Sequence, residues 1–457
     1  MDTPAPAELD RLILDSAVEA NILPITSRCS CHCVFCSHKN NPPGIAVYSV
    51  GTRSLEQITR TLAFLDPGKV ITIGESATPV IEGEPLVHPA FTEIVSLVRR
   101  VFPQTPVEIT TNGARLSAQL VEFLEGIGNV ALNVSLSSSS ERGRRLLMGE
   151  SAGHAAQAIE GVKLLARSRL RYSGSLVALP NLVGWEDVRE TVLFLASNEA
   201  IAVRVVAPAF SALADPQMLA ETRYLYPDLR AFVESLPAEL PCPVLLEPSC
   251  PSDLTPVVSG VLRDSPAQRA GVRCGDVVET VNGRKPRLRV EAWQWLLPAG
   301  PVVAEIRRDG AVRTVAWSNE MEGGAGITME YDFDPARAER LGEALAACSG
   351  LSLLLTSTLG RRVVDRVLEL LQAGPLVAEA VTAENTTFGG TIGAAGLLTV
   401  DDYLAAYREW AGSRPTGAPV PVQVIVPQES FDRRGLDLRR TPVSRLEEGV
   451  GLRVIVS

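Results

Sequence analysis

Between residues 20 and 210 the sequence alternates short runs rich in β-branched residues with amphipathic stretches. Sustained alternation of this kind predicts a parallel sheet with covering helices, because each parallel strand needs a crossover connection. Six strand–helix units predict an α/β fold, a partial (β/α)6 barrel with its chemistry at the carboxyl ends of the strands. The expected strands are 21–28, 69–75, 107–113, 130–137, 174–180 and 203–208, with helical patterns that include 55–65, 91–102 and 185–196.

The chain divides after a proline-rich stretch at 236–256, where the spacing of apolar residues changes. Residues 257–284 predict a small β module, and from about 322 onward strand and helix patterns mix. A chain of 457 residues is long enough for about three domains of roughly 150 residues each. We therefore expect a barrel domain at 1–250, an inserted β domain at 252–321 and a C-terminal α+β domain at 322–457.

Composition places the chain among ordinary globular proteins and limits the partners and the cellular compartment that we expect for it. Hydrophobic residues make up 46% and charged residues 21%, which excludes a disordered chain. The net charge of −10 argues against a nucleic-acid partner, and no run approaches the roughly 18 apolar residues of a membrane-spanning helix. The first residues lack the features of a signal peptide, so we expect a cytoplasmic protein whose eight cysteines are reduced.

Three cysteines cluster directly after the first expected strand. Cys29, Cys33 and Cys36 lie in the segment RCSCHCVFC. Thiolates spaced Cys-x-x-x-Cys-x-x-Cys on one loop can hold three irons of a [4Fe-4S] cluster. The fourth iron then has no protein ligand and can bind a small molecule.

Two other arrangements of the cysteines remain open. One is a zinc site held by Cys31, His32 and His38, although zinc prefers a closed site with four tetrahedral ligands. The other is a set of buried thiols that bind no metal. Cys31 lies at the wrong spacing for the iron motif and is interpreted as a bystander. An auxiliary cluster and isolated thiols are both compatible with the remaining cysteines, Cys242, Cys250, Cys274 and Cys348.

The cysteine motif, the aromatic Phe35 before its third cysteine and the parallel-sheet pattern resemble the radical S-adenosylmethionine (SAM) superfamily over residues 20–210. The resemblance implies that the open iron binds the amino and carboxylate groups of SAM. It also implies that one electron from the cluster cleaves SAM to a 5′-deoxyadenosyl radical, so a donor such as flavodoxin or ferredoxin is expected. Phe35 is assigned to the cofactor site on the same ground.

In this superfamily a Gly-Gly-Glu after the second strand contacts the SAM ammonium, and two segments here resemble it. The first is Gly74-Glu75, at the end of the expected strand 69–75, with Ile73 in place of one glycine. The second is Glu84, in EGEPLVHPAF, further from the strand. A carboxylate in a site with little water pairs well with a cation. Strand position favours Glu75, and both residues stay candidates.

Later segments also resemble this superfamily, and the resemblance implies further contacts with SAM. Asn112, in ITTNG, is expected near the SAM carboxylate. Ser135 and Ser137, in LNVSLSS, are expected near the ribose, with the strand directing one of them toward it. Arg144 and Arg145 follow, either as carboxylate partners or as part of a solvated helix face.

The segment 265–283 resembles the PDZ signature of bacterial proteins. PDZ domains bind an extended peptide as an added strand, with a helix as the other wall of the groove. The helical segment 290–298 brings Trp293 and Trp295 near that groove, which implies a peptide or protein partner. A purely architectural domain is the alternative, because no carboxylate-binding loop is obvious.

The last part of the chain, from 383–403 to 424–435, resembles a C-terminal domain of unknown function. That domain accompanies radical SAM and PDZ modules in a family of iron–sulfur oxidoreductases, in which the PDZ module is N-terminal instead of central. Around Asn385, Thr386, Thr387 and the pair Gly389-Gly390 we expect either a polar turn facing the barrel mouth or a tight structural turn.

The sequence therefore predicts a radical SAM enzyme that abstracts hydrogen from an unidentified substrate. Two alternatives come from other classes of protein. One is an iron–sulfur electron-transfer or sensor protein without SAM chemistry, and the other is a peptide-binding scaffold with an inactive barrel. The Glu, Asn and Ser residues at the strand ends argue against the first, and the three ligand cysteines argue against the second.

Overall fold

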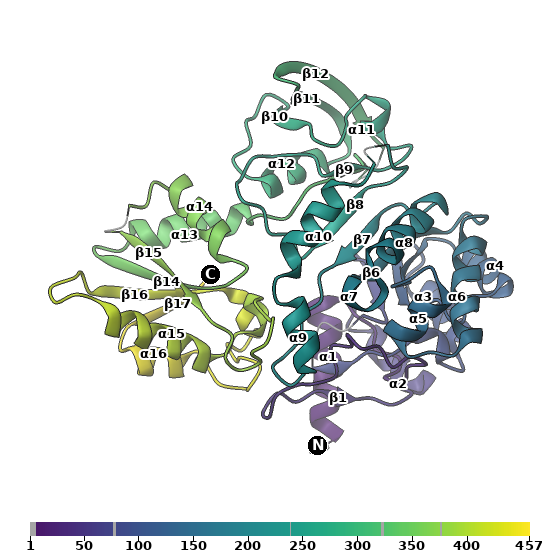
Figure 1. The fold of residues 1–457 in the computed structure, drawn as a ribbon, viewed down its shortest axis with the longest axis horizontal. Helices are drawn as coiled ribbons and strands as arrows, with labels where there is room; N and C mark the ends of the chain where they lie inside the picture. Colours follow the sequence, from purple (N-terminus) through teal and green to yellow (C-terminus); the bar gives the residue numbers. More distant parts are fainter. Residues whose placement is uncertain (1–5, 76–78, 238, 321–323, 375–376) are drawn as a thin grey trace. The chain divides into compact units, whose positions relative to one another are not determined.

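The computed structural model describes the chain from residue 6 onward, except residues 76–78, 238, 321–323 and 375–376. The chain forms two compact units, whose elements are labelled in Figure 1. Unit 1 comprises Met1–Lys39, Ala46–Pro208 and Tyr224–Leu246, and unit 2 comprises Asn40–Ile45, Ala209–Arg223 and Glu247–Ser457. The boundary expected at 321 and 322 lies outside the described residues, and the three-domain division stays a prediction.

Unit 1 is built around one six-stranded sheet with the strand order β2-β4-β5-β6-β7-β8. The pairings from β2 through β7 are all parallel, which confirms the expected α/β fold. The strands are β2 (Ile71–Ile73), β4 (Val107–Thr111), β5 (Val130–Ser135), β6 (Arg171–Val177), β7 (Val203–Val206) and β8 (Val244–Glu247).

The edges of the sheet differ from the expectation. The segment 21–28 contributes a single bridge to the sheet, from Ile22 to Thr72, instead of a strand. Pro24 has no N–H to donate and interrupts any ladder there. The sixth strand is β8, which lies inside the proline-rich stretch 236–256. A small separate sheet pairs β1 (Tyr48–Ser49) with β3 (Val80–Ile81).

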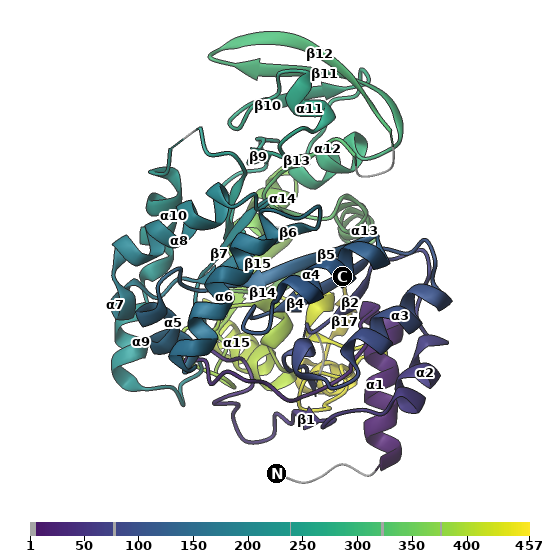
Figure 2. The same ribbon diagram turned by 90° about the vertical axis from the view of Figure 1, so that its right-hand side faces the viewer.

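Helices cover one face of the six-stranded sheet, as Figure 2 shows for α3, α4 and α6. Leu124 of α4 and Val162 of α6 are fully buried in one core with Ile109 and Val134 of the strands. The helices of unit 1 are α1 (Pro6–Ala20), α2 (Leu55–Leu62), α3 (Phe91–Val101), α4 (Ala118–Ile127), α5 (Glu141–Met148), α6 (Ala152–Leu165), α7 (Pro180–Val183), α8 (Trp185–Ser197) and α10 (Leu225–Glu234).

The junction between α5 and α6 is short because both ends are capped. Helix α5 ends at Gly149, whose φ of +60° is left-handed and suits glycine. Helix α6 begins at Ser151, whose hydroxyl accepts a hydrogen bond from the His154 backbone N–H. Only Glu150 lies between these two caps, so its side chain is held in a defined place.

The other face of the sheet is mostly polar. Parallel strands covered on both faces are normally apolar throughout. Here the residues that alternate with the core positions include Thr110 on β4, Asn133 on β5 and Ser173 on β6, which are neighbours in the strand register. We call this face the inner face, and its further members are Thr72, Glu108, Ser135, Ser175 and Arg204.

The PDZ region of unit 2 contains two small sheets around one apolar core. Strands β10 (Val277–Val281), β11 (Gly300–Arg308) and β12 (Ala311–Asn319) are antiparallel. Strand β13 (Ile327–Thr328) pairs with β9 (Gly260–Val261) in the antiparallel sense. Helices α11 (Pro266–Arg269) and α12 (Arg289–Leu296) complete this region.

The C-terminal region of unit 2 is a four-stranded sheet with the order β15-β14-β16-β17 and only parallel pairings. Strands and helices alternate, so this region is built in the α/β manner where the sequence suggested α+β. Its elements are α13 (Pro335–Ala346), β14 (Leu351–Ser357), α14 (Arg361–Leu370), β15 (Ala378–Ala383), α15 (Val400–Ser413), β16 (Pro421–Val426), α16 (Ser444–Val450) and β17 (Arg453–Val456). Unit 2 also contains α9 (Pro216–Thr222).

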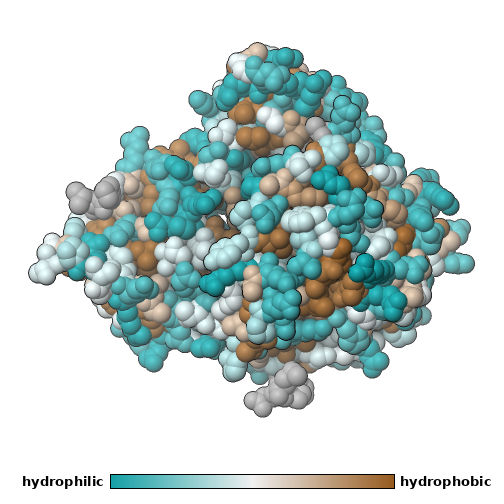
Figure 3. All heavy atoms as spheres, in the orientation of Figure 1, coloured by the Kyte–Doolittle hydropathy of each residue, from teal (hydrophilic) through white to brown (hydrophobic). Residues whose placement is uncertain are grey.

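Polar and charged side chains cover most of the face visible in Figure 3, in keeping with the charge content of the chain. Among the described residues, no helix combines the length and the apolar character that crossing a membrane requires.

Candidate functional site

The cysteine loop, residues 29–36, follows the extended segment 21–28 and contains neither helix nor strand. Cys29 is exposed, Cys33 and Cys36 are half-buried, and all three are free thiols. The Cys36 N–H donates a hydrogen bond to the Cys33 carbonyl oxygen (3.4 Å), so these two residues share one turn. The predicted ligands are therefore accessible thiols on one short segment.

The loop is docked on the end of helix α5 through its backbone. His32 N–H donates to the Met148 carbonyl (2.8 Å), and Val34 N–H donates to the Leu147 carbonyl (2.9 Å). A Cβ atom at Gly149 would lie 3.0 Å from the His32 carbonyl oxygen. Glycine at this position thus serves both the left-handed helix end and the close approach of the loop.

Glu84 is the candidate carboxylate that lies against this loop. Its side chain is only 3% exposed and accepts hydrogen bonds from the Thr111 hydroxyl (2.7 Å) and the Asn112 backbone N–H (2.7 Å). Its own N–H donates to the Arg28 carbonyl (2.8 Å), next to Cys29. Burial raises the pKa of Glu84, against the opposing effect of these donors.

The other candidate, Glu75, is exposed and directly precedes residues outside the described part of the chain. Its charge acts on Glu108 of the inner face, where burial and then Glu75 raise the pKa of the Glu108 carboxyl. Gly74 has a φ of +86°, and a Cβ there would lie 2.5 Å from the Thr110 carbonyl oxygen. Gly74 therefore allows the chain to turn tightly out of β2. The charge of Glu75 acts on Glu108, whereas the carboxylate of Glu84 is bound to Thr111 and Asn112.

Asn112, at the end of β4, links that strand to the cysteine loop. Its Nδ2 atom donates to the Cys31 sulfur (3.2 Å) and the Ser30 hydroxyl (3.4 Å), and lies 4.0 Å from the Cys29 sulfur. The structure thus brings Cys29, Glu84 and Asn112 together, as expected for a shared site.

The remaining predicted residues lie further along the sheet or the loop. Ser135 accepts a hydrogen bond from the Ser175 hydroxyl (3.3 Å) on the inner face. Ser137 is buried with a φ of +59°, so it belongs to the turn after β5 and not to the strand. Phe35 is half-buried within the cysteine loop.

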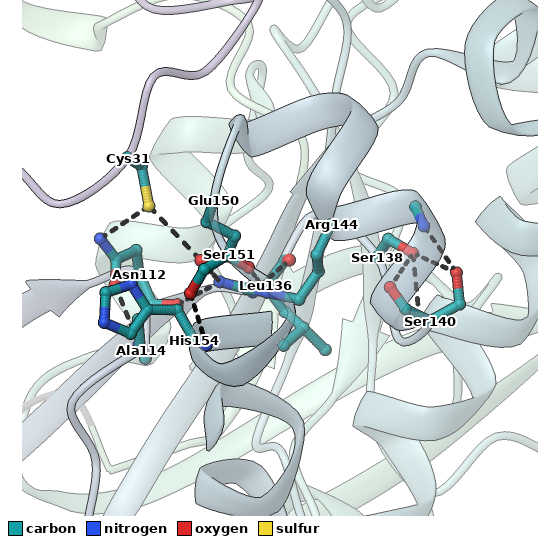
Figure 4. Close-up of polar contacts among 12 residues, drawn as sticks. Cys31, Asn112, Ala114, Leu136, Ser138, Ser140, Arg144, Glu150, Ser151 and His154 are labelled. Atoms are coloured by element: carbon teal, nitrogen blue, oxygen red, sulfur yellow. Dashed lines mark hydrogen bonds and ion pairs between the residues drawn. The ribbon is translucent and has the colours of Figure 1, made fainter. Parts of the chain in front are cut away.

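A buried ion pair lies behind the cysteine loop (Figure 4). The side chains of Arg144 and Glu150 are both 0% exposed, and Arg144 Nε and Nη2 donate to the two carboxylate oxygens of Glu150. Arg144 also donates to the Leu136 carbonyl (2.6 Å) and the Asn112 carbonyl (2.9 Å). The solvated-helix alternative is wrong for Arg144 and fits only the exposed Arg145.

Glu150 is the residue that the sequence interpretation missed. Its Oε2 atom lies 3.6 Å from the Cys31 sulfur, so the ion pair continues into the cysteine loop. The only feature of the sequence that points to Glu150 is its position: it is a single carboxylate between the glycine that ends one helix and the serine that begins the next. That it would meet Arg144 and Cys31 depends on the tertiary fold.

The inner face holds two buried oxygen atoms without a hydrogen-bond partner among the described residues, Thr110 Oγ1 and Asn133 Oδ1. The two residues are directly opposite each other in the register of β4 and β5. Asn133 is 5% exposed. Buried polar groups are normally paired, so this pair of atoms is suited to a ligand or to ordered water.

The other cysteines and histidines have separate surroundings. No group of three or more His, Cys, Asp or Glu side chains in the described part of the chain is already arranged around a common metal position. Burial lowers the pKa of His38, one of the residues considered for zinc. Cys242 lies in the apolar core of unit 1, Cys274 donates to the Ser259 carbonyl and Cys348 to the Gly350 carbonyl. Cys250 is half-buried.

The donor set of the cysteine loop nevertheless fits an iron–sulfur cluster. The Cys31 thiol, burial and the Glu84 charge raise the pKa of Cys29. Thiols that gather near carboxylates without a nearby cation resist ionisation, and a positively charged metal centre removes that penalty. A bound cluster would therefore complement the surroundings of Cys29.

In the PDZ region, the expected helix and the edge strand lie side by side. The carbonyls of Gly326 and Thr328 accept hydrogen bonds from the N–H groups of Leu262 and Ser259, which flank β9. The Ile327 carbonyl therefore faces the other edge of β13, which we call its free edge because no described strand pairs with it. The indole N–H of Trp293, on α12, donates to that carbonyl (3.2 Å). Trp295 instead stacks against the Arg284 guanidinium, 3.9 Å from its ring centre.

The predicted polar turn of the C-terminal region is tightly packed. Asp402 is fully buried and accepts hydrogen bonds from the backbone N–H groups of Thr386 (2.9 Å) and Thr387 (3.0 Å). A Cβ at Gly390 would lie 2.2 Å from the Phe210 carbonyl oxygen. Asn385 donates to the Leu397 carbonyl (2.8 Å). These contacts favour the structural interpretation of this turn.

Comparison with known families identifies two regions. A model described as the radical SAM superfamily matches residues 23–195, and a model of the PDZ domain matches residues 257–308. Curated relatives are GTP 3′,8-cyclases, for example that of Klebsiella pneumoniae (33% identity over 141 residues) and that of Lactiplantibacillus plantarum (30% over 147 residues). These matches cover 31% and 32% of this chain and 40% and 41% of the relatives.

Solved structures resemble the chain only distantly. Streptococcus suis SuiB bound to S-adenosylmethionine gives a TM-score of 0.37 at 16% identity and covers 50% of each chain. The structure of anSMEcpe with bound AdoMet and a Kp18Cys peptide gives 0.32 at 14% identity, over 46% of this chain and 60% of that one.

Proposed function

Because residues 23–195 of this chain belong to the radical SAM superfamily and residues 257–308 form a PDZ domain, we propose that the chain is a radical SAM enzyme. The observation that carries the proposal is the meeting of Cys29, Glu84 and Asn112 at the carboxyl ends of the strands. An iron–sulfur protein without SAM chemistry has no need of a buried carboxylate and an amide at this place.

In this proposal Cys29, Cys33 and Cys36 hold a [4Fe-4S] cluster and leave one iron for SAM. When bound, the two cofactors supply a carbon radical able to abstract hydrogen. The protein binds, orients and shields the reactants. Glu84 offers a buried negative charge to the SAM ammonium, and Asn112 offers an amide to the SAM carboxylate. Phe35, Gly74, Ser135 and Ser137 remain proposed members of the cofactor site.

We further propose that the substrate lies against the inner face of the sheet. Thr110 Oγ1 and Asn133 Oδ1 are buried acceptors without partners among the described residues, so a substrate that presents N–H or O–H groups would satisfy them. The relatives are named for chemistry on GTP, but this chain shares only about two fifths of their length. The proposed substrate class is therefore a polar molecule with hydrogen-bond donors.

The reaction is tested with anaerobically reconstituted full-length chain, SAM and a reductant. We expect 5′-deoxyadenosine to form and the yield to rise when a substrate is present. Reduced flavodoxin and ferredoxin are compared with dithionite to test the proposed electron donors. A chain that assembles the cluster but neither binds nor cleaves SAM would support the electron-transfer alternative instead.

Glu84→Gln is expected to weaken SAM binding by roughly 1.5–3 kcal/mol, the range for losing a hydrogen bond to a charged group. Iron content and the melting temperature are measured alongside calorimetric SAM titration, because Glu84 also accepts hydrogen bonds from Thr111 and Asn112. Glu75→Gln is the matched control and should bind SAM normally. Unchanged affinity in both variants would remove the carboxylate assignment, and a loss in Glu75→Gln alone would reverse it.

For the PDZ domain we propose peptide binding by strand addition at the free edge of β13. The Ile327 carbonyl faces that edge, and α12 forms the opposite wall, so a peptide strand would find both sides of a groove. The Trp293 indole N–H already occupies this carbonyl. An incoming peptide amide would therefore compete with the indole for this carbonyl.

Trp293→Phe is expected to bind C-terminal peptides about 1 kcal/mol more tightly, roughly five-fold, because the ring stays apolar but no longer competes for the Ile327 carbonyl. Binding is measured on the full chain with an immobilised library of short peptides that have free carboxyl termini. Trp185→Phe, a similarly exposed tryptophan on α8, is the control. Absence of binding in all three proteins would favour the architectural alternative.

A further inference from the structure

The cysteine loop contains four thiols, one more than the three that hold a [4Fe-4S] cluster with an iron left free for SAM. Cys31 lies between Cys29 and Cys33, and its own N–H lies 3.4 Å from the Cys29 sulfur. Four cysteine thiolates are the usual complement of a closed [4Fe-4S] cluster, in which every iron has a protein ligand. A loop with four cysteines can therefore block the iron that SAM needs.

The Cys31 thiol is held by two side chains that lie outside the cysteine loop. It is 9% exposed, its sulfur accepts a hydrogen bond from Asn112 Nδ2 (3.2 Å), and its S–H donates to Glu150 Oε2 (3.6 Å). Figure 4 shows these two contacts meeting at the sulfur. Both hydrogen-bonding capacities of the thiol are thus in use.

Glu150 is itself held in place. Arg144 binds both of its carboxylate oxygens, and Arg144 is tied in turn to the carbonyls of Leu136 and Asn112 at the ends of β5 and β4. The acceptor that faces Cys31 is therefore anchored, through Arg144, to residues at the ends of two sheet strands.

We propose that the Arg144–Glu150 pair, together with Asn112, is a positioning device that keeps the Cys31 thiol out of the iron–sulfur cluster and so preserves the open iron for SAM. The proposal rests on the proposed function. Ligation of Cys31 would require its thiol to lose a proton to solvent, and its sulfur would then occupy the iron position meant for the SAM amino and carboxylate groups. Arg144 and Glu150 act through Cys31 and do not touch SAM in this proposal.

The test removes the anchor without leaving a buried charge. Arg144→Met/Glu150→Leu replaces both ions by apolar side chains of similar size, a change that buried ion pairs often tolerate. The same double change is also made together with Cys31→Ala, and Cys31→Ala alone is the control. Full-length proteins are reconstituted anaerobically, and iron content, SAM binding by equilibrium dialysis and the effect of SAM on the EPR spectrum of the reduced cluster are measured.

We expect the double variant to retain about four irons but to bind SAM at least about ten-fold more weakly, with an EPR spectrum that SAM no longer changes. Adding Cys31→Ala should restore both readouts, and Cys31→Ala alone should resemble the unmodified chain. Normal SAM binding in the double variant overturns the proposal. So does a loss of iron or of SAM binding that Cys31→Ala fails to restore.

Failure of the proposed function gives a different result, because the unmodified chain then lacks iron or does not bind SAM. Circular dichroism and thermal melting establish first that each variant folds. If the double variant does not fold, Glu150→Gln with and without Cys31→Ala replaces it, since glutamine keeps one carbonyl acceptor beside Arg144. The same restoration by Cys31→Ala is then expected.

Discussion

Replacing Cys29, Cys33 and Cys36 together by alanine is expected to leave the anaerobically reconstituted chain without iron, where the unmodified chain holds about four irons. The three thiols are free, lie on one loop and are the proposed ligands. Broad absorption near 400 nm and the paramagnetic signal of the reduced protein should disappear with the iron. Iron analysis, absorption and EPR measure the loss, and SAM cleavage should be abolished as well.

Two further variants show whether the loss is specific. Cys274→Ala removes an exposed thiol of the PDZ region and should retain all the iron, because this residue is in the other unit. Cys31→Ala should also retain it, because Cys31 is not a proposed ligand. Full iron content in the triple variant would show that the ligand assignment is wrong, and the remaining cysteines would then become the candidates.

Arg144→Ala is expected to lower the free energy of unfolding by about 3–5 kcal/mol, the range for breaking a buried ion pair by removing one partner. The change leaves the Glu150 carboxylate buried and without its cation, and it leaves the Leu136 and Asn112 carbonyls without their Arg144 donor. Chemical denaturation followed by circular dichroism measures the effect.

The exposed neighbour Arg145 provides the matched comparison, and Arg145→Ala should change stability by no more than about 0.5 kcal/mol. Arg144→Met/Glu150→Leu should be markedly more stable than Arg144→Ala, because it leaves no charge unpaired. Equal stability of Arg144→Ala and Arg145→Ala would show that the buried ion pair does not stabilise the fold by the expected amount.

The part of the fold that could be predicted is the part set by local pattern. Strands β4 to β7 lie within or overlap the expected ranges, since β-branched runs between amphipathic stretches specify them directly. The segment 21–28 has the same composition but contains Pro24 and forms one bridge to the sheet. Strand β8 was missed because prolines surround it, and at a sheet edge such a strand needs few paired N–H groups.

For the candidate site too, some features could be predicted from local sequence pattern and others could not. The spacing of Cys29, Cys33 and Cys36 is visible in the sequence because the proposed iron ligation requires it. Which of Glu75 and Glu84 lies against the cysteine loop was not visible in the sequence, since it depends on how the chain returns from β3 to the end of β4. The pairing of Arg144 with Glu150 and the contact of Trp293 with Ile327 likewise join residues through the fold. Sequence pattern carries little information about such contacts.

The side-chain oxygens of Thr110 and Asn133, which have no hydrogen-bond partner in the described part of the chain, affect how the chain responds to small molecules. A molecule that binds only the folded chain raises its stability by RT ln(1 + [L]/Kd), which is about 2.7 kcal/mol at a hundred-fold excess over Kd. A molecule whose donors meet these two oxygens also removes the cost of burying them without partners. The melting temperature of the chain therefore reports binding. The compounds that raise it most indicate which chemical groups the inner face accepts.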